Sequence, residues 1–342
     1  MTESDGGFAL DEARLAAYLE ERVAGFRGPL VATKFPGGQS NPTYRIDTPG
    51  GRYVLRRKPP GRLLPSAHAV DREYRVMRAL ADTEVPVPRV FLLCEDDSVI
   101  GSAFYLMEHV EGRVFWDPAL PGESPESRAA IYDEMNRVLA ALHAVDPAAV
   151  GLADFGRPGN YFARQVGRWT KQYRATETES IPEMEHLIRW LPEHLPDDDG
   201  RVAIVHGDFR LDNMIFHPTE PRVLALLDWE LSTLGHPLAD LAYQCMQWRL
   251  PHQCIMPGLG GLDRAALGIP SEEAYVARYC ERLGLPGIAD WHFYLAFSFF
   301  RLAAILQGVK KRALDGNASS DKALAMGELV VPLARLGVEM TA

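Results

Sequence analysis

The alternation of apolar and polar residues divides the chain into a strand-rich beginning and a long helical remainder. Short apolar runs predict five strands, at 30–35, 44–47, 52–57, 89–94 and 103–107. Apolar residues spaced three and four apart predict helices at 10–23, 70–80, 126–144, 161–175, 183–194, 238–248, 271–283, 291–312 and 321–336. The pattern therefore predicts an α+β fold, in which a five-stranded part precedes a mainly helical part.

One apolar run, at 291–309, is long enough to raise the question of a membrane-spanning helix. Arg301 lies near its middle, and an arginine at the centre of a bilayer costs roughly 2.5 to 3.5 kcal/mol. His292, Ser298 and Gln307 add further polar groups. We therefore expect a buried core helix and no membrane partner.

Composition and charge narrow the class of protein. The chain has 342 residues, of which 47% are hydrophobic, enough for a packed core distributed over two lobes. A net charge of −10, without a long basic tract, argues against a nucleic-acid partner. The four cysteines show no C-x-x-C spacing and no secretory leader precedes them, which predicts reduced thiols in the cytoplasm. The sequence does not specify an oligomeric state.

Three polar residues follow short apolar runs at spacings that suit phosphoryl transfer. His206-Gly207-Asp208 ends one run, Asn213 follows Asp208 by five positions, and Asp228 ends the next run. Phosphoryl transfer needs a carboxylate to hold the attacking hydroxyl and ligands for the Mg²⁺ that neutralises the phosphate oxygens. Asp208, Asn213 and Asp228 are suited to these roles.

The same residues carry a family resemblance. H-x-D-x-x-x-x-N resembles the catalytic loop of protein kinases, with Asp228-Trp229-Glu230 in the place of their Asp-Phe-Gly. Gly207 and the later segment PLADLA, at 237–242, make the chain most similar to the aminoglycoside phosphotransferase and choline kinase branch. Within it, VLRRKPPG, DREY and HGDFRLDN resemble the phosphotransferase domain that is fused to acyl-CoA dehydrogenases.

The resemblance covers about 25–340 and implies a bilobal, protein-kinase-like fold. It implies an N-lobe with a small antiparallel sheet at 1–107, a hinge at 108–112 and a helical C-lobe at 113–342. It also implies ATP and Mg²⁺ as cofactors, with adenine bound by the main chain of Glu108 and Val110 in the hinge.

In the catalytic loop, the resemblance makes Asp208 the catalytic base and Asn213 and Asp228 the Mg²⁺ ligands. Arg210 stands where many kinases carry a lysine that touches the transferring phosphate, and its guanidinium suits two phosphate oxygens. The alternative for Arg210 is a surface arginine that pairs with Asp212.

Three further residues near this loop have expected roles. His206 is expected to brace the loop, and the resemblance implies that Asp240 anchors the backbone of the loop. Glu230 is either a further contact for Mg²⁺ or substrate, or the partner of a neighbouring base.

The segment 36–43, between the first two strands, is the candidate phosphate-binding loop. Gly38, Ser40 and Asn41 make it small enough for backbone N–H groups to approach a phosphate. It lacks G-x-G-x-x-G, so an ordinary hairpin turn is the alternative.

Arg56 occupies the place of the lysine that kinases direct at the α- and β-phosphates. Alternation along 52–57 selects Arg56 over its neighbours, and Lys58 remains the second candidate. Glu73 lies on the apolar stripe of helix 70–80, where a carboxylate needs a cation to offset its desolvation. We therefore expect an Arg56–Glu73 pair.

The acceptor substrate is the least determined part of the prediction. Arg301, on a buried helix, needs a partner, which is either internal, such as Asp240 or another carboxylate, or an anionic substrate with Trp248 nearby. The resemblance to the fused domain implies a hydroxyacyl thioester. The sequence thus predicts an ATP- and Mg²⁺-dependent kinase that phosphorylates a hydroxyl of a small molecule, with an antibiotic kinase and a nucleotide-binding pseudokinase scaffold as alternatives.

Overall fold

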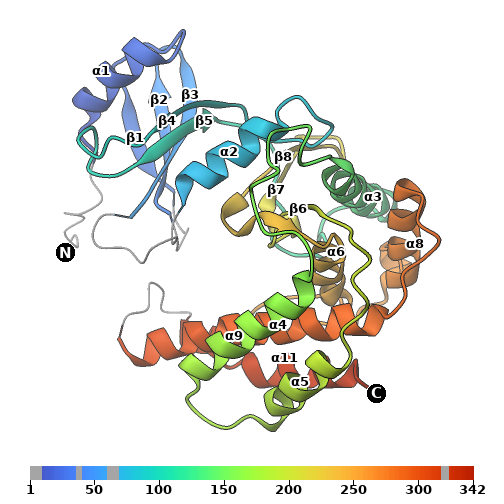
Figure 1. The fold of residues 1–342 in the computed structure, drawn as a ribbon. Coiled ribbons are helices and arrows are strands. Elements are labelled where there is room, and N and C mark those ends of the chain that lie inside the picture. The colour runs from blue at the N-terminus through green and yellow to red at the C-terminus, as the bar shows by residue number, and fades with distance from the viewer. Residues whose placement is uncertain (1–9, 36–40, 60–68, 317–322) are drawn as a thin grey trace. The chain divides into compact units, whose positions relative to one another are not determined.

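The structure is a computed structural model that describes residues 10–35, 41–59, 69–316 and 323–342. The chain divides into two compact units (Figure 1). Unit 1 consists of the described residues of Met1–Gly112 together with Leu224–Leu231. Unit 2 consists of Arg113–Val223 and the described residues of Ser232–Ala342.

Unit 1 is built on one five-stranded antiparallel sheet. Its strands are β1 (Val31–Lys34), β2 (Thr43–Thr48), β3 (Gly51–Arg57), β4 (Val90–Cys94) and β5 (Phe104–Glu108), in the order β1-β2-β3-β5-β4. Each neighbouring pair is antiparallel. The predicted small antiparallel sheet is therefore confirmed, with bounds that differ by one or two residues.

Two helices complete unit 1. Helix α1 (Glu12–Arg22) begins at Asp11, whose carboxylate accepts the N–H of Arg14 at 3.0 Å, and it buries Leu15 and Leu19 in the core cluster. Helix α2 (Val70–Leu80) packs against β4 and β5. Glu73 lies on its buried stripe, which directs a carboxylate into the interior of unit 1.

The segment 224–231 returns to unit 1 after a long excursion through unit 2. It contains most of β8 (Val223–Leu226) and the 3₁₀ turn η2 (Trp229–Leu231). The N–H of Leu226 donates to the carbonyl of Pro86 at 2.8 Å, Trp229 is buried, and η2 contacts α2. These contacts bring Asp228 and Glu230 next to the residues of α2.

Unit 2 is mainly helical. Its helices are α3 (Pro125–Ala144), α4 (Tyr161–Thr176), α5 (Pro182–Glu193), α6 (Leu238–Cys245), α7 (Arg264–Leu267), α8 (Glu272–Leu283), α9 (Trp291–Leu314), α10 (Ala323–Gly327) and α11 (Val330–Glu339). Strands β6 (Ala203–Val205) and β9 (Thr233–Gly235) pair antiparallel, and β7 (Met214–Phe216) follows the 3₁₀ turn η1 (Leu211–Asn213).

Helix α9 lies at the centre of unit 2. It packs against α4, α6, α10 and α11, and Figure 1 shows it running beneath α4 and beside α11. By length and composition α9 could cross a membrane, but 83% of its apolar window is buried inside the protein. The expected core helix is confirmed.

Two predicted helices are shorter in the structure than expected. The helix predicted at 238–248 continues after Cys245 as the 3₁₀ turn η3 (Met246–Trp248). The helix predicted at 321–336 is wrong as a single element, because α10 ends at Gly327 and α11 begins at Val330; residues 321 and 322 lie outside the described residues. Pro332 has no N–H to donate to a preceding turn of helix. Proline is therefore tolerated only in the first turn, and α11 begins two residues before Pro332.

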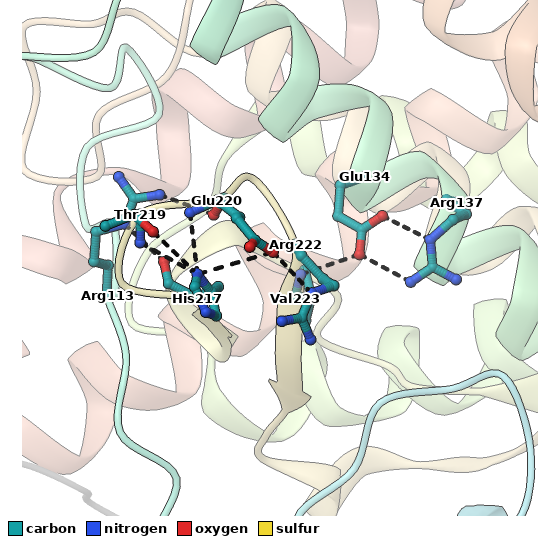
Figure 2. Close-up of polar contacts among 8 residues, drawn as sticks. All are labelled: Arg113, Glu134, Arg137, His217, Thr219, Glu220, Arg222 and Val223. Atoms are coloured by element: carbon teal, nitrogen blue, oxygen red, sulfur yellow. Dashed lines mark hydrogen bonds and ion pairs between the residues drawn. The ribbon is translucent and has the colours of Figure 1, made fainter.

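A polar network fixes the turn that follows β7 (Figure 2). Arg113 donates to the carbonyls of His217 and Glu220, both at 3.0 Å. The ring of His217 accepts the N–H of Glu220 at 3.2 Å, and the carboxylate of Glu134 accepts the N–H of Val223 at 3.0 Å. The strand that follows the candidate catalytic loop is thus fixed at its far end by side chains of unit 2.

Candidate active site

The loop between β6 and β7, residues 206–213, carries the candidate site residues of unit 2. Its backbone is bound by one carboxylate, because Asp240 Oδ2 accepts the N–H of His206 at 2.6 Å and Oδ1 accepts the N–H of Gly207 at 2.8 Å. Gly207 has φ of 86°, a conformation that residues with a Cβ rarely adopt. The predicted anchoring role of Asp240 is confirmed.

His206 supports the same loop from inside. It is fully buried, and its Nδ1 accepts the N–H of Asp208 at 3.2 Å. This contact confirms the expected bracing role and leaves Asp208 as the group that the loop presents.

The environment of Asp240 favours the ionised carboxylate. Burial alone would raise its pKa, but a hydrogen bond with His143, favourable electrostatic interactions with His143 and His206 and the N–H of Gly207 outweigh burial and lower the pKa of Asp240. His143 is oriented in turn by the hydroxyl of Tyr279, at 2.7 Å from its Nδ1. The anchor of the loop is therefore a buried anion with several partners.

Asp208 itself is bound at both carboxylate oxygens. The hydroxyl of Tyr243 donates to Oδ1 at 2.8 Å, and Nδ2 of Asn213 lies 3.1 Å from Oδ2 and 2.9 Å from the main-chain carbonyl of Asp208. Since Nδ2 of Asn213 faces Asp208, the carbonyl oxygen of the same amide is left as a possible ligand for a cation.

Tyr243 was not predicted from the sequence. The available signal was its place in α6, three residues after Asp240, because residues three apart lie on the same face of a helix. Because Asp240 in the first turn of α6 binds the loop, Tyr243 in the next turn faces the same loop.

Arg210 pairs with Asp212. Its Nε donates to Asp212 Oδ1 at 2.9 Å, and its Nη2 contacts Oδ2 of the same carboxylate. Burial disfavours the Arg210 charge, but Tyr243, Asp212 and Asp208 more than offset this and raise the pKa of Arg210. The alternative prediction, that Arg210 pairs with Asp212, is thus confirmed, although Arg210 is half-buried and does not lie on the surface.

Arg56 is the centre of the candidate site residues of unit 1. Its Nε lies 3.0 Å from Oε2 of Glu73, and its Nη2 lies 2.7 Å from Oδ1 of Asp228 and 3.3 Å from Oε2 of Glu230. The Nε contact is an ion pair without hydrogen-bond alignment. The predicted Arg56–Glu73 pair is confirmed, and Glu230 contacts the same base.

Glu73 is the most deeply buried carboxylate of this cluster. Tyr105 donates its hydroxyl to Oε2 at 3.0 Å and Asn41 donates Nδ2 to Oε1 at 2.7 Å. Burial raises the pKa of Glu73, while Arg56, Tyr105 and Asn41 oppose the rise. Asn41, expected at the phosphates, thus binds Glu73 with its side chain, whereas Gly38 and Ser40 lie outside the described residues.

The charges around Arg56 do not balance. Three carboxylates surround one guanidinium, so with all of them ionised the four groups carry a net charge of −2, which a divalent cation would neutralise. Asp228 and Glu230 are partly exposed, and Asp228 adopts an uncommon φ of 63°. Among the described residues no group of three His, Cys, Asp or Glu side chains is arranged to hold a metal ion by itself.

The remaining nucleotide candidates are placed as follows. Lys58 lies 3.8 Å from Asp71 and is more exposed than Arg56. The N–H of Glu108 donates to the carbonyl of Arg89 at 2.8 Å, so a main-chain contact of Glu108 with a base is limited to its carbonyl. Val110 follows β5 in the segment 109–112, which has no regular secondary structure.

Arg301 has an internal partner, but not the expected kind. Its Nη2 donates to the carbonyl of Gly207 at 2.6 Å, and its guanidinium lies 5.2 Å from the ring centre of Tyr243 and 5.6 Å from that of Trp169. The expectation of a carboxylate partner is wrong, because a carbonyl dipole and two aromatic faces stabilise the charge instead. Arg301 therefore supports the catalytic loop.

Trp248 lies in the core of unit 2. It is 4% exposed, its indole N–H donates to the carbonyl of Pro270 at 2.8 Å, and its ring packs against Tyr132 and Tyr275. The structure gives Trp248 a packing role, and its contact with substrate stays a prediction.

A pocket of about 430 Å³ lies beside the catalytic loop within unit 2. Its polar lining consists of Arg210, Asp212, Tyr243 and Gln247. The apolar lining is larger and comes from Trp116, Pro118, Leu211, Met246, Leu250, Ile255, Met256, Pro257, Leu302 and Met326. We call this the acceptor pocket, because Tyr243 connects it to Asp208.

Comparison with known proteins agrees with the fold described above. The crystal structure of a candidate aminoglycoside phosphotransferase from Ralstonia eutropha JMP134 is similar, with a TM-score of 0.89, 57% identity and coverage of 97% of this chain and 98% of that chain. Aminoglycoside phosphotransferase APH(4)-Ia, solved with AMP-PNP and hygromycin B, has a TM-score of 0.63 at 17% identity, covering 96% and 99%, which shows the fold alone. The predicted bilobal kinase-like fold is thus confirmed.

The fold and the Asp208 loop define a small-molecule O-phosphotransferase. A model of the phosphotransferase enzyme family matches residues 31–297, and the chain belongs to that family. Acyl-CoA dehydrogenase family member 10 of Mus musculus is 56% identical over 310 residues, which are 90% of this chain and 29% of that protein. The chain thus spans less than a third of this relative, and the resemblance to the fused phosphotransferase domain is confirmed.

Proposed function

We propose that this protein uses ATP and Mg²⁺ to phosphorylate a hydroxyl group on an acyl chain, as in a hydroxyacyl thioester. The observation that carries the proposal is the acceptor pocket, whose wall residue Tyr243 donates a hydrogen bond to the candidate base Asp208. An apolar chain in this pocket would lie beside the carboxylate that accepts its hydroxyl proton.

The predicted catalytic, phosphate and metal residues have roles in this proposal. Asp208 would bind the acceptor hydroxyl, orient its oxygen and take its proton as that oxygen bonds to the γ-phosphorus of ATP and the bond to the leaving ADP breaks. Arg56 and Arg210 would steady the phosphates, and Asn213 and Asp228 would hold Mg²⁺ through the amide oxygen and the carboxylate. When bound, MgATP supplies the phosphoryl group and the positive charge that neutralises it.

The adenine contacts of the proposal use the main chain of the segment after β5. The carbonyl of Glu108 and the backbone of Val110 are proposed to bind the base, since the N–H of Glu108 is engaged by Arg89.

The lining of the acceptor pocket favours an acyl chain over a cationic antibiotic. Asp212 is the carboxylate among its lining residues, and it is paired with Arg210. An amine-rich acceptor would need acidic partners, since ammonium groups lose solvation on burial. The name of the 56% identical relative points the same way, because acyl-CoA dehydrogenases act on acyl thioesters.

The test is transfer of phosphate from MgATP to a panel of hydroxyacyl thioesters, aminoglycosides and choline, followed by mass spectrometry. We expect a phosphorylated hydroxyacyl product with the wild type and only a small residual amount with Asp208→Asn. Phosphorylation of an aminoglycoside alone would overturn the acyl assignment and favour an antibiotic kinase. ATP binding without any product would favour the pseudokinase scaffold.

A further inference from the structure

The hydroxyl of Tyr243 contacts the candidate base of the loop 206–213. Tyr243 is 5% exposed, and its hydroxyl donates to Oδ1 of Asp208 at 2.8 Å, while Asn213 contacts Oδ2 at 3.1 Å. Two donors on opposite oxygens restrict rotation of the carboxylate about its own axis. We propose that Tyr243 is a positioning residue that fixes the Asp208 carboxylate for proton transfer and couples it to the acceptor pocket.

The tyrosine ring is fixed by its surroundings. It belongs to α6, the helix whose Asp240 binds the backbone of the loop at His206 and Gly207. On another side, the guanidinium of Arg301 lies 5.2 Å from the ring centre and donates to the carbonyl of Gly207. Arg301 thus contacts both the loop and the ring, and Asp240 binds the loop from the helix that carries the ring.

The phenol is suited to a donor role at any working pH. Burial, with the neighbouring Asp208 carboxylate, raises the pKa of Tyr243 well above its ordinary value, so that the hydroxyl stays protonated. A protonated phenol donates to one lone pair of Oδ1 and leaves others on the carboxylate for the hydroxyl of the acceptor.

Tyr243 also forms part of the wall of the acceptor pocket, beside Arg210, Met246 and Leu302. An acceptor chain that fills the pocket would lie against the same ring whose hydroxyl orients the base. Tyr243 therefore connects two properties that are usually set by separate residues, the position of the acceptor and the orientation of the base.

This inference rests on the proposed function, because it assigns Tyr243 a part in that reaction. The first test is Tyr243→Phe, which keeps the ring and removes the donor. We expect kcat for the acceptor to fall about 10- to 100-fold, as for a misplaced catalytic group, with KM for ATP and for the acceptor changed less than about twofold. An unchanged kcat, or a loss confined to KM, would overturn the inference.

A matched control and a second background separate positioning from general structure. Tyr173→Phe removes another buried hydroxyl of unit 2, one without a hydrogen-bond partner among the described residues, and is expected to leave kcat unchanged. In the Asp208→Asn background, Tyr243→Phe is expected to cause little further loss, because its effect passes through Asp208. An equal fold-loss in both backgrounds would show that the tyrosine acts by another route.

A measurement independent of activity keeps the inference separate from the proposed function. The melting temperatures of wild type, Tyr243→Phe, Asp208→Asn and the double variant are expected to be non-additive by about 2 °C or more. If the wild type phosphorylates no acceptor while this coupling is present, the proposed function fails and the contact stands. Additive shifts in melting temperature would overturn the contact itself.

Discussion

Arg56 and Asp228 are 172 positions apart in the sequence, and Nη2 of Arg56 lies 2.7 Å from Oδ1 of Asp228. The contact forms because residues 224–231 return to unit 1 and place η2 against α2. A residue proposed to bind phosphate and a residue proposed to bind Mg²⁺ are thus direct partners.

The first prediction concerns the choice between Arg56 and Lys58. Arg56→Ala should weaken ATP binding by on the order of tenfold or more, since hydrogen bonds to charged groups contribute about 1.5 to 3 kcal/mol. Lys58→Ala, in which a more exposed base is removed, should change the affinity less than about threefold. Isothermal titration calorimetry with MgATP measures both, and the reverse order would transfer the phosphate role to Lys58.

The second prediction is that Glu73 stabilises unit 1 as a charged acceptor. Asn41 and Tyr105 both donate hydrogen bonds to the carboxylate of Glu73. In Glu73→Gln the amide N–H₂ group would face one of these two donors, so that a buried donor would lose its acceptor. We expect the free energy of unfolding to fall by about 2 to 4 kcal/mol. Urea unfolding measures this, with exposed Glu95→Gln as the control that should change stability by less than about 0.5 kcal/mol.

The third prediction concerns the pH dependence of stability through Asp240. The pKa of Asp240 is lower in the folded protein than its ordinary value, so its contribution to stability is full above the unfolded pKa of about 3.9. That contribution is lost as the pH falls through the lower, folded pKa.

Wild type should therefore be more stable than Asp240→Asn at pH 7, and the difference should shrink as the pH falls below about 4. Urea unfolding at a series of pH values gives the two curves. A difference that stays constant with pH would show that the charge of Asp240 is not the source of its effect.

The fourth prediction tests the acceptor pocket without disturbing the fold. Ile255 lines the pocket and is 44% exposed, so Ile255→Asp should fold normally and place a charge against an apolar acceptor chain. We expect KM for a hydroxyacyl acceptor to rise roughly tenfold, with ATP affinity unchanged, because burying an unpaired charge is unfavourable. Leu314→Asp, at an exposed site outside the pocket lining, is the matched control and should behave like wild type in steady-state kinetics.

The fifth prediction addresses the metal. Removal of Mg²⁺ with EDTA should abolish transfer, and Asp228→Asn should raise the Mg²⁺ concentration for half-maximal activity by on the order of tenfold, since a charged ligand is replaced by a neutral one. Asp82→Asn, at an exposed position, is the control. An unchanged Mg²⁺ requirement in Asp228→Asn would remove Asp228 from the set of ligands.

Several features of the fold and the site followed from local pattern. Alternation in 52–57 selected Arg56, and helical spacing in 70–80 placed Glu73 on the buried stripe, so that one unpaired cation and one unpaired anion predicted each other. The spacing of Asp208, Asn213 and Asp228 likewise indicated the reaction class, whereas the anchoring of the loop by Asp240 came from the family resemblance. These inferences succeeded because each depends on spacing or on a single charge that has to be balanced.

What the sequence alone determined is therefore the class of fold, the order of the elements and the residue types that the chemistry requires. Where several partners are chemically acceptable for one residue, only the tertiary structure decided which of them it contacts. Arg301 could have been balanced by a carboxylate, but a carbonyl and two rings are equally able to stabilise it, and Trp248 could have lined a pocket or the core. The hydrogen bond between Tyr243 and Asp208 was also decided by tertiary structure, because packing determines which residue lies opposite a hydroxyl group on a helix.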